Sequence, residues 1–369
     1  MTMPSTVLAE RGANVGLISL NRPEALNALS LEMIAAITQA LLQWRDDPQV
    51  HMVVLRGSNK AGAVGTPERW FGHFCAGGDI RFFHDAAKAG DSALDDFFTQ
   101  EYTLNHLIQT YAKPIVAFMD GVVMGGGMGL CQGIALRIVT EKTKMAMPET
   151  KIGLFPDVGG GHFLSRCPGA VGEYLALTGQ VIGADAAIAY GLADARIAAS
   201  EQASLWQALS DTAFTSSDQA LSFLSSRLSD TGTGTALAPI LQAAFSLPDV
   251  AKILAALDAS TDELSQQTAA ALRERSPLML HVTLEQIRRA RSMGLADELR
   301  MEWDMVWRCF HHRPVADSET VEGIRALAVD KDHQPRWKPA RIADVDAAEV
   351  AQFFLSPVAP EAHPLRHLR

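Results

Sequence analysis

The sequence predicts an α/β protein with a mostly parallel sheet, followed by a helical C-terminal region. As far as about residue 205, apolar runs of strand length alternate with segments of helical periodicity, an order typical of βα units. Beyond that point helical patterns dominate, strand candidates are few, and Ser and Thr accumulate between residues 215 and 235. We therefore expect a core over residues 1–205 and a helical region over residues 206–369.

The first two expected elements are a strand and a helix. Val15–Leu20 (VGLISL) is an apolar run of strand length, and Pro23 prevents its continuation because proline has no N–H to donate. Ser30 is a suitable N-cap for the helix that follows. The buried face of this helix is marked by apolar residues at helical spacing, namely Ile34, Ile37, Leu41 and Trp44.

Three further apolar runs predict buried strands of the sheet. They are near-continuous, as expected for strands that helices cover on both faces, and comprise Val50–Leu55, Ile115–Phe118 and Ile134–Val139. The whole stretch Ile115–Leu136 is apolar enough to suggest a membrane span, but it contains six glycines. We interpret it as a strand, a turn and a buried helix.

The last expected feature is an irregular tail. Asp330–Pro339 (DKDHQPRWKP) is too polar and too interrupted by proline to form a regular element. It nevertheless contains Trp337, whose large ring requires an apolar surface. We expect this tail to pack back on the core.

Composition argues against several partners. Lys and Arg total 32 against 42 Asp and Glu, giving a formal net charge of -10 without any basic run, so neither nucleic acid nor an anionic membrane is expected to bind. The four cysteines lie far apart and form no CxxC pair, which argues against a disulfide framework and a zinc site. The N-terminus lacks the pattern of a secretory signal or of an Arg-rich transit peptide, so we expect a cytoplasmic protein.

Glycine is concentrated in two places where backbone N–H groups would be exposed. Ala76, Gly77 and Gly78 follow a short strand-like segment, and Gly125–Gly127 open a predicted helix. The N–H groups of Gly78 and Gly126 could together stabilise negative charge, as an oxyanion hole does. The alternative is that these glycines only permit tight turns and close packing.

Three carboxylates are candidates for chemistry. Glu101 shares the apolar face of its helix with Phe97, Leu104 and Ile108, so it should be at least partly buried. Glu149 (in MPET) and Asp157 (in LFPDVGGG) have apolar surroundings that would raise a carboxyl pKa, and either could act as base, acid or nucleophile. The alternatives are a solvated loop position for Glu149, a helix N-cap for Asp157, and a packing role for nearby His162.

Several familiar catalytic motifs do not occur. The sequence contains no HExxH, no GxSxG, no P-loop, and no GxGxxG that follows a strand with an acidic residue at the right distance. Serine hydrolases, kinases and Rossmann dehydrogenases are therefore disfavoured.

Four ordered motifs resemble those of the crotonase superfamily, also called the enoyl-CoA hydratase/isomerase family. They are NRPEALNAL (21–29), FCAGGDI (74–80), KPIVAFMDGVVMGGGMGL (113–130) and MPETKIGLFPDVGG (147–160). The resemblance implies a crotonase-like ββα superhelix that binds acyl-CoA, with the thioester carbonyl held by the N–H groups of Gly78 and Gly126. It also implies that Ala76 and Gly77 contact the substrate, and that the chain forms a homo-oligomer as its relatives often do.

Within the family, the chain most resembles the 3-hydroxyisobutyryl-CoA hydrolases. The similarity continues through QEYTLN (100–105), VEGIRA (321–326) and DKDHQPRWKP. It implies that Glu101, Gly126, Glu149 and Asp157 contact the substrate and that a thioester is hydrolysed, as in valine breakdown. It also implies that no metal or organic cofactor takes part, because CoA is the leaving group of the substrate.

The differences from the hydratases favour the hydrolase interpretation. Hydratases carry a glutamate where this chain has Gly129, and they read PGAGG where this chain supplies Asp157. Two alternatives remain open, an enoyl-CoA hydratase or isomerase and an acyl-CoA-binding protein without activity. A long loop at Ala61–Trp70 and only loose similarity between about 200 and 320 leave the preferred acyl group open.

Overall fold

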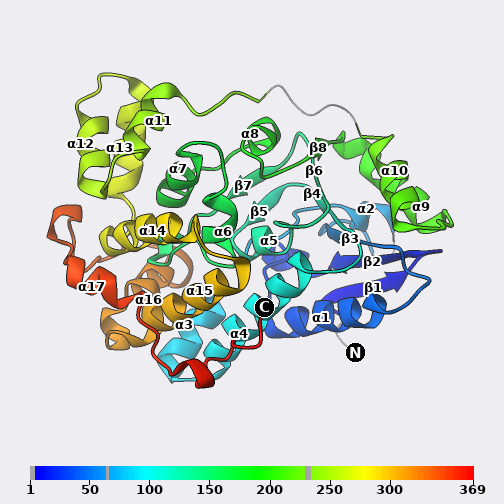
Figure 1. Cartoon of the computed structure of the whole chain (residues 1–369), viewed down its shortest axis with the longest axis horizontal. Helices are drawn as coiled ribbons and strands as arrows, with labels where there is room; N and C mark the ends of the chain where they lie inside the picture. Colours follow the sequence, from blue (N-terminus) through cyan, green and yellow to red (C-terminus); the bar gives the residue numbers. More distant parts are fainter. Residues whose placement is uncertain (1–4, 64–65, 229–233) are drawn as a thin grey trace. The chain divides into compact units, whose positions relative to one another are not determined.

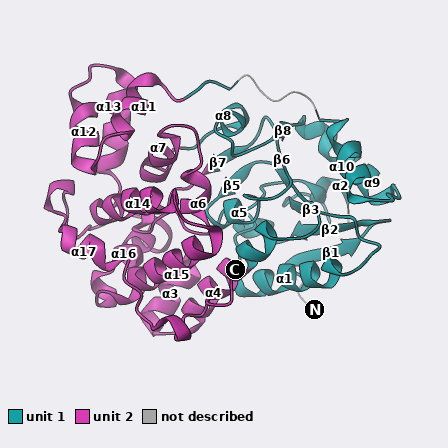
Figure 2. Ribbon diagram, in the orientation of Figure 1, with its two compact units in different colours: residues 1–78, 104–145, 181–236 teal, residues 79–103, 146–180, 237–369 magenta. Residues whose placement is uncertain are grey.

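A computed structural model describes residues 5–63, 66–228 and 234–369. Its chain forms two compact units, shown in teal and magenta in Figure 2. Unit 1 contains residues 1–78, 104–145 and 181–236, and unit 2 contains residues 79–103, 146–180 and 237–369. Parts of the predicted loop at 61–70 and of the Ser/Thr-rich stretch lie outside the described residues. The domain boundary expected near residue 205 stays a prediction. The two compact units are each made of three separate segments of the chain, and none of these segments ends at residue 205.

Unit 1 is built on a six-stranded, mostly parallel sheet, as predicted. Its strands, in spatial order, are β1 (Val7–Arg11), β2 (Val15–Leu20), β3 (Met52–Gly57), β4 (Ile115–Met119), β6 (Leu136–Val139) and β8 (Ala195–Arg196). Only β1 runs antiparallel to its neighbour, and Figure 1 shows the sheet passing from blue β1 to green β8. The sequence analysis missed β1 because its residues are mostly exposed and form no apolar run.

Helices of unit 1 cover both faces of this sheet, which explains the continuous apolar runs. Val15, Leu17 and Val54 pack in one core with residues of α9 (Gln202–Asp211) and α10 (Ser217–Ser225). On the other face, a Cβ added at Gly16 would lie 2.4 Å from the ring of Trp44 in α1 (Leu31–Arg45). A strand buried on both sides has no polar face.

Helix α1 forms as the sequence predicts. Ser30 is its N-cap, and the Ser30 hydroxyl accepts a hydrogen bond from the N–H of Met33 at 3.3 Å. All four of the predicted apolar positions are buried. The predicted strand starts were less accurate, since β3 and β6 each begin two residues later than expected.

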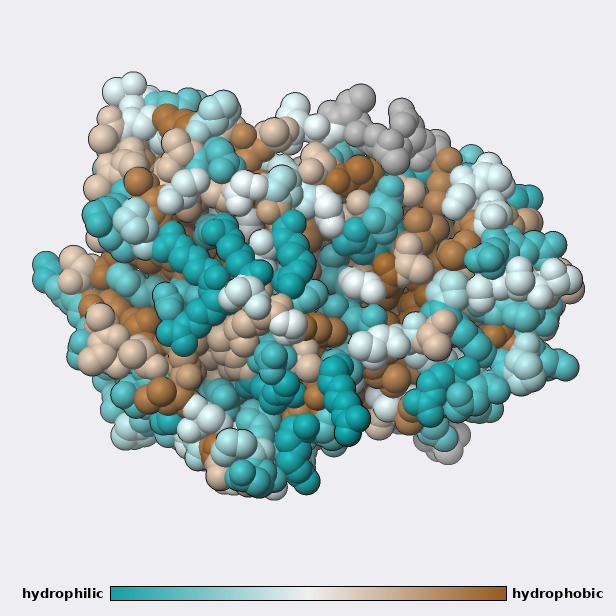
Figure 3. Space-filling model, in the orientation of Figure 1, coloured by the Kyte–Doolittle hydropathy of each residue, from teal (hydrophilic) through white to brown (hydrophobic). Residues whose placement is uncertain are grey.

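The apolar stretch that begins at Ile115 is the expected strand, turn and buried helix. After β4 come β5 (Val122–Met124), which pairs with β7 (Lys144–Ala146), and the short helix α5 (Gly126–Gly129). Short helices α2 (Pro67–Trp70) and α8 (Ala184–Ala189) complete unit 1. No described helix is long and apolar enough to cross a membrane. On the face shown in Figure 3, hydrophilic residues are spread widely among smaller hydrophobic groups.

Unit 2 is mainly helical, which confirms the predicted helical C-terminal region. The described residues 237–369 form helices and no strand, namely α11 (Pro239–Phe245), α12 (Val250–Asp258), α13 (Glu263–Arg273), α14 (Pro277–Ala290), α15 (Leu295–His311), α16 (Glu319–Ile324) and α17 (Ala347–Gln352). Earlier segments add α3 (Ile80–Ala89), the first part of α4 (Ala93–Gln109), the 3-10 helix η2 (Glu149–Ile152), α6 (Gly160–Leu164) and α7 (Val171–Thr178).

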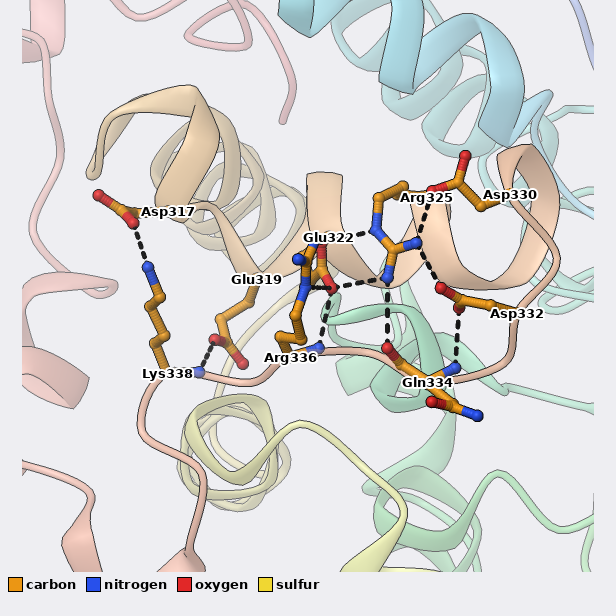
Figure 4. A network of polar contacts seen from close by, with 9 residues as sticks. All are labelled: Asp317, Glu319, Glu322, Arg325, Asp330, Asp332, Gln334, Arg336 and Lys338. Atoms are coloured by element: carbon orange, nitrogen blue, oxygen red, sulfur yellow. Dashed lines mark hydrogen bonds and ion pairs between the residues drawn. The ribbon is translucent and has the colours of Figure 1, made fainter.

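The tail at 330–338 is irregular, as expected, and is held by ion pairs (Figure 4). Arg325 contacts Asp330 at 2.6 Å and Asp332 at 2.7 Å, and the Lys338 N–H donates to Glu319 at 2.6 Å. Glu319 lies in α16, and Arg325 follows it directly. Helix α16 packs on η2, where the Thr320 hydroxyl donates to the carbonyl of Gly153, the C-cap of η2, at 2.6 Å. Within unit 2 the tail is therefore tied to the segment that carries Glu149.

Trp337 is half-buried in this tail. It lines a cavity of about 440 Å³, together with Ala326, Leu327 and the charged side chains of Lys151 and Arg273. The apolar side chains of Ala326 and Leu327, which line this cavity with Trp337, follow α16 directly in the chain.

Candidate active site

Five carboxylates gather in the interior of unit 2. Three are the predicted ones, with exposed fractions of 2% for Glu101 and 6% for both Glu149 and Asp157. The other two, Glu298 and Glu302, lie one turn apart on α15 and are 0% exposed. These groups are close enough to raise one another's pKa by repulsion, in addition to the larger effect of burial. So much unbalanced acidity is costly to a fold, and such clusters are typical of functional sites.

Glu149 begins η2 and points into the protein. The next residue, Thr150, anchors this segment. Its hydroxyl donates a hydrogen bond to the Leu177 carbonyl at 3.1 Å. The Ser276 N–H donates to the Thr150 carbonyl at 3.0 Å. The interpretation of Glu149 as a solvated loop residue is therefore wrong. Burial raises its pKa well above the usual range, and the charge of Asp157 adds to this effect.

Asp157 lies in the turn that leads into α6. Its carboxylate accepts a hydrogen bond from the Tyr102 hydroxyl at 2.8 Å, while Gly159 is the N-cap of α6. The interpretation of Asp157 as an N-cap is therefore wrong, because its side chain faces the carboxylate cluster. Burial and then the charge of Glu302 raise the pKa of Asp157 to about 7, against the opposing effect of the Tyr102 hydrogen bond. A carboxyl group with this pKa can give or take a proton near neutrality.

Glu101 is buried on α4, as its helical spacing predicted. Its Oε1 atom, like Oε2 of Glu149, accepts no hydrogen bond from the described residues. Burial raises the pKa of Glu101 well above the usual range, followed by the charges of Asp157 and Glu149. Buried oxygens without donors are available to a ligand that carries hydroxyl groups.

The sequence analysis missed Glu298 and Glu302, although a signal was present. Together with Met305 and Cys309 they follow the spacing i, i+4, i+7 and i+11. This is the same pattern that places Glu101 on a buried helix face. Glu302 accepts hydrogen bonds from the N–H groups of Gly159 at 2.7 Å and Gly161 at 3.0 Å.

The predicted oxyanion residues lie together in unit 1. The loop Ala76–Gly78 is held by the Leu29 N–H, which donates to the Gly77 carbonyl at 2.7 Å. A Cβ added at Gly77 would lie 3.7 Å from the nitrogen of Gly126, so the loop runs beside the start of α5. No backbone hydrogen bond from the Gly78 or Gly126 N–H occurs within the described part of the chain. Both N–H groups can therefore serve a ligand.

The structure thus brings the predicted site residues together in two groups. Ala76, Gly77, Gly78 and Gly126 form one group in unit 1, and Glu101, Glu149 and Asp157 form the other in unit 2. His162, on α6, is half-buried, and burial lowers its pKa to about 4, so it is neutral at pH 7. Among the described residues, no three His, Cys, Asp or Glu side chains are arranged to hold a metal ion.

Comparison with known sequences places this site in context. A family model described as enoyl-CoA hydratase/isomerase matches residues 15–354. The chain is 36% identical over 355 residues to "3-hydroxyisobutyryl-CoA hydrolase, mitochondrial" of Gallus gallus, covering 94% of this chain and 88% of the relative. It is also 36% identical over 364 residues to "Probable 3-hydroxyisobutyryl-CoA hydrolase 3" of Arabidopsis thaliana, covering 96% and 92%.

Two solved structures resemble nearly the whole chain. One is a carnitinyl-CoA dehydratase from Mycobacterium thermoresistibile, with 35% identity, a TM-score of 0.81 and coverage of 97% of this chain and 98% of that one. The other is an enoyl-CoA hydratase from Rhodobacter sphaeroides, with 36% identity, a TM-score of 0.81 and coverage of 96% and 98%.

Proposed function

The chain belongs to the enoyl-CoA hydratase/isomerase family, and we propose that it hydrolyses 3-hydroxyisobutyryl-CoA to 3-hydroxyisobutyrate and CoA, a reaction of valine breakdown. The predicted crotonase-like fold with a helical C-terminal region is confirmed by the two solved structures. These two structures are a carnitinyl-CoA dehydratase and an enoyl-CoA hydratase, so the choice between activities must be argued from the residues of the site. The observation that carries the proposal is the buried group of Glu101, Glu149 and Asp157.

The proposed reaction begins at the thioester carbonyl. The N–H groups of Gly78 and Gly126 hold its oxygen and stabilise the negative charge that develops when the carbon is attacked. Glu149 either removes a proton from the attacking water or attacks the carbon itself, giving an anhydride that water then cleaves. In both routes the C–S bond breaks and the CoA sulfur takes up a proton.

Asp157 and Glu101 have different environments, which suit them to proton transfer and to binding of the acyl hydroxyl group, respectively. Asp157, with a pKa of about 7, supplies the proton for the CoA sulfur or orients the acyl hydroxyl group. Glu101, with an unpartnered oxygen, accepts a hydrogen bond from that hydroxyl group. Hydrolysis of a thioester needs only water, a carboxylate and oxyanion stabilisation, so we propose no metal or organic cofactor.

The alternative activities have less support. A hydratase would use a second glutamate shortly after the triple glycine, but α5 carries Gly129 there and no carboxylate. An acyl-CoA-binding protein without activity would be favoured if Glu149 and Asp157 faced solvent, but both are buried.

The proposal is tested by replacing Glu149 with glutamine, which keeps the shape of the side chain and removes its basicity. Glu149→Gln should lower kcat for 3-hydroxyisobutyryl-CoA by about 10²–10⁴-fold, because general-base or nucleophilic catalysis is lost. Release of free thiol measures the rate, and calorimetric titration with CoA should show nearly unchanged binding.

A parallel assay with crotonyl-CoA follows the loss of enoyl absorbance. Slow hydration with fast thiol release from the hydroxyacyl thioester supports the hydrolase. Near wild-type thiol release by Glu149→Gln, or fast hydration without thiol release, would overturn it.

A further inference from the structure

Glu302 on α15 accepts two hydrogen bonds from the turn that carries Asp157, although no sequence motif singles it out. We propose that Glu302 is a positioning residue, which fixes Asp157 through the backbone of its turn. The proposal rests on the hydrolase function, because it assigns a role relative to the proton-handling group of that reaction.

The first argument is the pair of hydrogen bonds on the C-terminal side of Asp157. Glu302 Oε2 accepts from the Gly159 N–H at 2.7 Å, and Glu302 Oε1 accepts from the Gly161 N–H at 3.0 Å. Between them, the Gly160 N–H donates to the carbonyl of Asp157 itself at 2.8 Å. Hydrogen bonds from backbone N–H groups to a carboxylate are among the stronger ones in proteins.

The backbone of this turn needs such support. Val158 has a φ of 58°, and Gly159 has a φ of 82°. A β-branched residue in the left-handed region is strained, and this conformation persists only where the surroundings enforce it. The two bonds from Glu302 follow directly after Val158, so they hold the strained turn in place.

The second argument is a tether on the other side of Asp157. The side-chain amide of Gln286 donates to the Pro156 carbonyl at 2.7 Å and to Glu302 Oε1 at 3.0 Å. Glu302 is therefore connected to the residue before Asp157, through Gln286, and to residues after it directly. The backbone is therefore held on both sides of Asp157, at Pro156 and at Gly159, by contacts that include Glu302. Such support from a neighbouring residue is expected to orient a reactive side chain.

The third argument is electrostatic. The charge of Glu302 is the largest influence on the pKa of Asp157 after burial, and it raises that pKa. The other titratable groups that interact with Asp157 come from α4, η2 and α15, and are Glu101, Tyr102, Glu149, Glu298 and Cys309. Of all these residues, only Glu302 also bonds the backbone of the turn within the described part of the chain.

The test compares Glu302→Gln with a matched variant outside the carboxylate cluster, Glu173→Gln. Both remove a buried carboxylate from unit 2, but Glu173, on α7, pairs with Arg291 at 2.5 Å and not with the Asp157 turn. A glutamine at 302 has one acceptor oxygen for two N–H donors, so the turn loosens. We expect kcat to fall by about 10- to 100-fold with KM changed less than about threefold, since misplacement of a catalytic group acts on turnover. Glu173→Gln should stay within about threefold of the wild-type kcat.

The kcat profile separates positioning from a general loss of stability. Folded Glu302→Gln should keep the limb that Asp157→Asn abolishes, but with a lower plateau, because Asp157 still titrates while it is misplaced. An unchanged kcat in folded Glu302→Gln would overturn the proposal. If Glu302→Gln does not fold, Gln286→Leu, which removes the tether to Pro156, should still lower kcat, and a wild-type kcat in that variant would count against positioning.

The two proposals fail in different ways. Full activity of Glu149→Gln rejects the hydrolase mechanism and leaves the hydrogen bonds of Glu302 without a catalytic meaning. An inactive Glu149→Gln together with a fully active Glu302→Gln rejects only the positioning role.

Discussion

At the scale of single residues, the Tyr102 hydroxyl group opposes the effects that raise the pKa of Asp157. Tyr102 is fully buried, and burial raises its pKa well above the usual range, so it donates a hydrogen bond to Asp157 at any neutral pH. This bond stabilises ionised Asp157 and opposes the effect of burial. The site therefore balances one donor against several acidic neighbours.

Removing this donor should shift the pH dependence of turnover. In Tyr102→Phe the ring still packs beside Phe98, whose ring centroid lies 6.1 Å away, but ionised Asp157 loses its hydrogen bond. The pKa of Asp157 should rise above about 7, and the corresponding limb of the kcat profile should move to higher pH by roughly one unit. Thiol-release rates between pH 5 and 9 measure this shift. A shift to lower pH would show that Tyr102 does not act on Asp157 as a donor.

At the scale of elements, α5 can lie close to the loop Ala76–Gly78 because Gly127 has no side chain toward the Cys75 carbonyl. A Cβ added at Gly127 would lie 2.4 Å from the carbonyl oxygen of Cys75, which precedes the loop Ala76–Gly78. Any side chain at this position must push the helix and the loop apart. The glycines of this motif therefore do more than permit turns, because they allow two backbone segments to approach closely.

Gly127→Ala tests whether this approach matters for function. We expect kcat to fall at least about 10-fold because the two N–H donors separate, and stability to fall by about 1–3 kcal/mol because of overpacking. Thiol release and urea unfolding measure the two effects. The matched control is Gly183→Ala, since a Cβ at Gly183 finds its nearest neighbour only at 4.0 Å. Equal activity of the two variants would contradict the proposed role of the loop and α5.

At the scale of the whole molecule, the buried carboxylates make stability depend on pH. Their folded-state pKa values are raised, so at a pH between the unfolded and folded values these groups take up protons when the chain folds, and stability falls as the pH rises. Their contribution is fully present below the unfolded pKa of about 4 and is lost as the pH rises through the folded values, which for Asp157 means about 7. Groups with lowered values, such as Glu322 with a pKa of about 2 and His162 with a pKa of about 4, act in the opposite sense at lower pH.

This dependence on pH predicts that Glu149→Gln, although inactive, is more stable than the wild type in mildly alkaline solution. Glu149→Gln removes a buried group that must ionise, so its free energy of unfolding should exceed that of the wild type at pH 8. At pH 5 the difference should shrink, because ionisation of Glu149 is less favoured at the lower pH. Urea unfolding at both pH values measures it, and a variant less stable than the wild type at pH 8 would refute the assigned shift.

The sequence by itself determined the α/β class, the parallel strands, α1 with its Ser30 cap, and the burial of Glu101. These features depend on local chemistry and on periodicity, which a single segment displays without its neighbours. The site residues Gly78, Gly126, Glu149 and Asp157 came from motifs and their resemblance to a family, and their roles stay proposals.

Only the tertiary structure decided what surrounds those residues. Glu149 and Asp157 have plausible exposed roles in their own segments, and they are buried because α15, α16 and the start of α4 cover them within unit 2. Glu302 lies 145 residues after Asp157 in the chain, yet it bonds the turn that follows Asp157. A hydrogen bond between segments so far apart leaves no trace in local spacing, because its energy depends on how the segments pack and not on the order of residues along the chain.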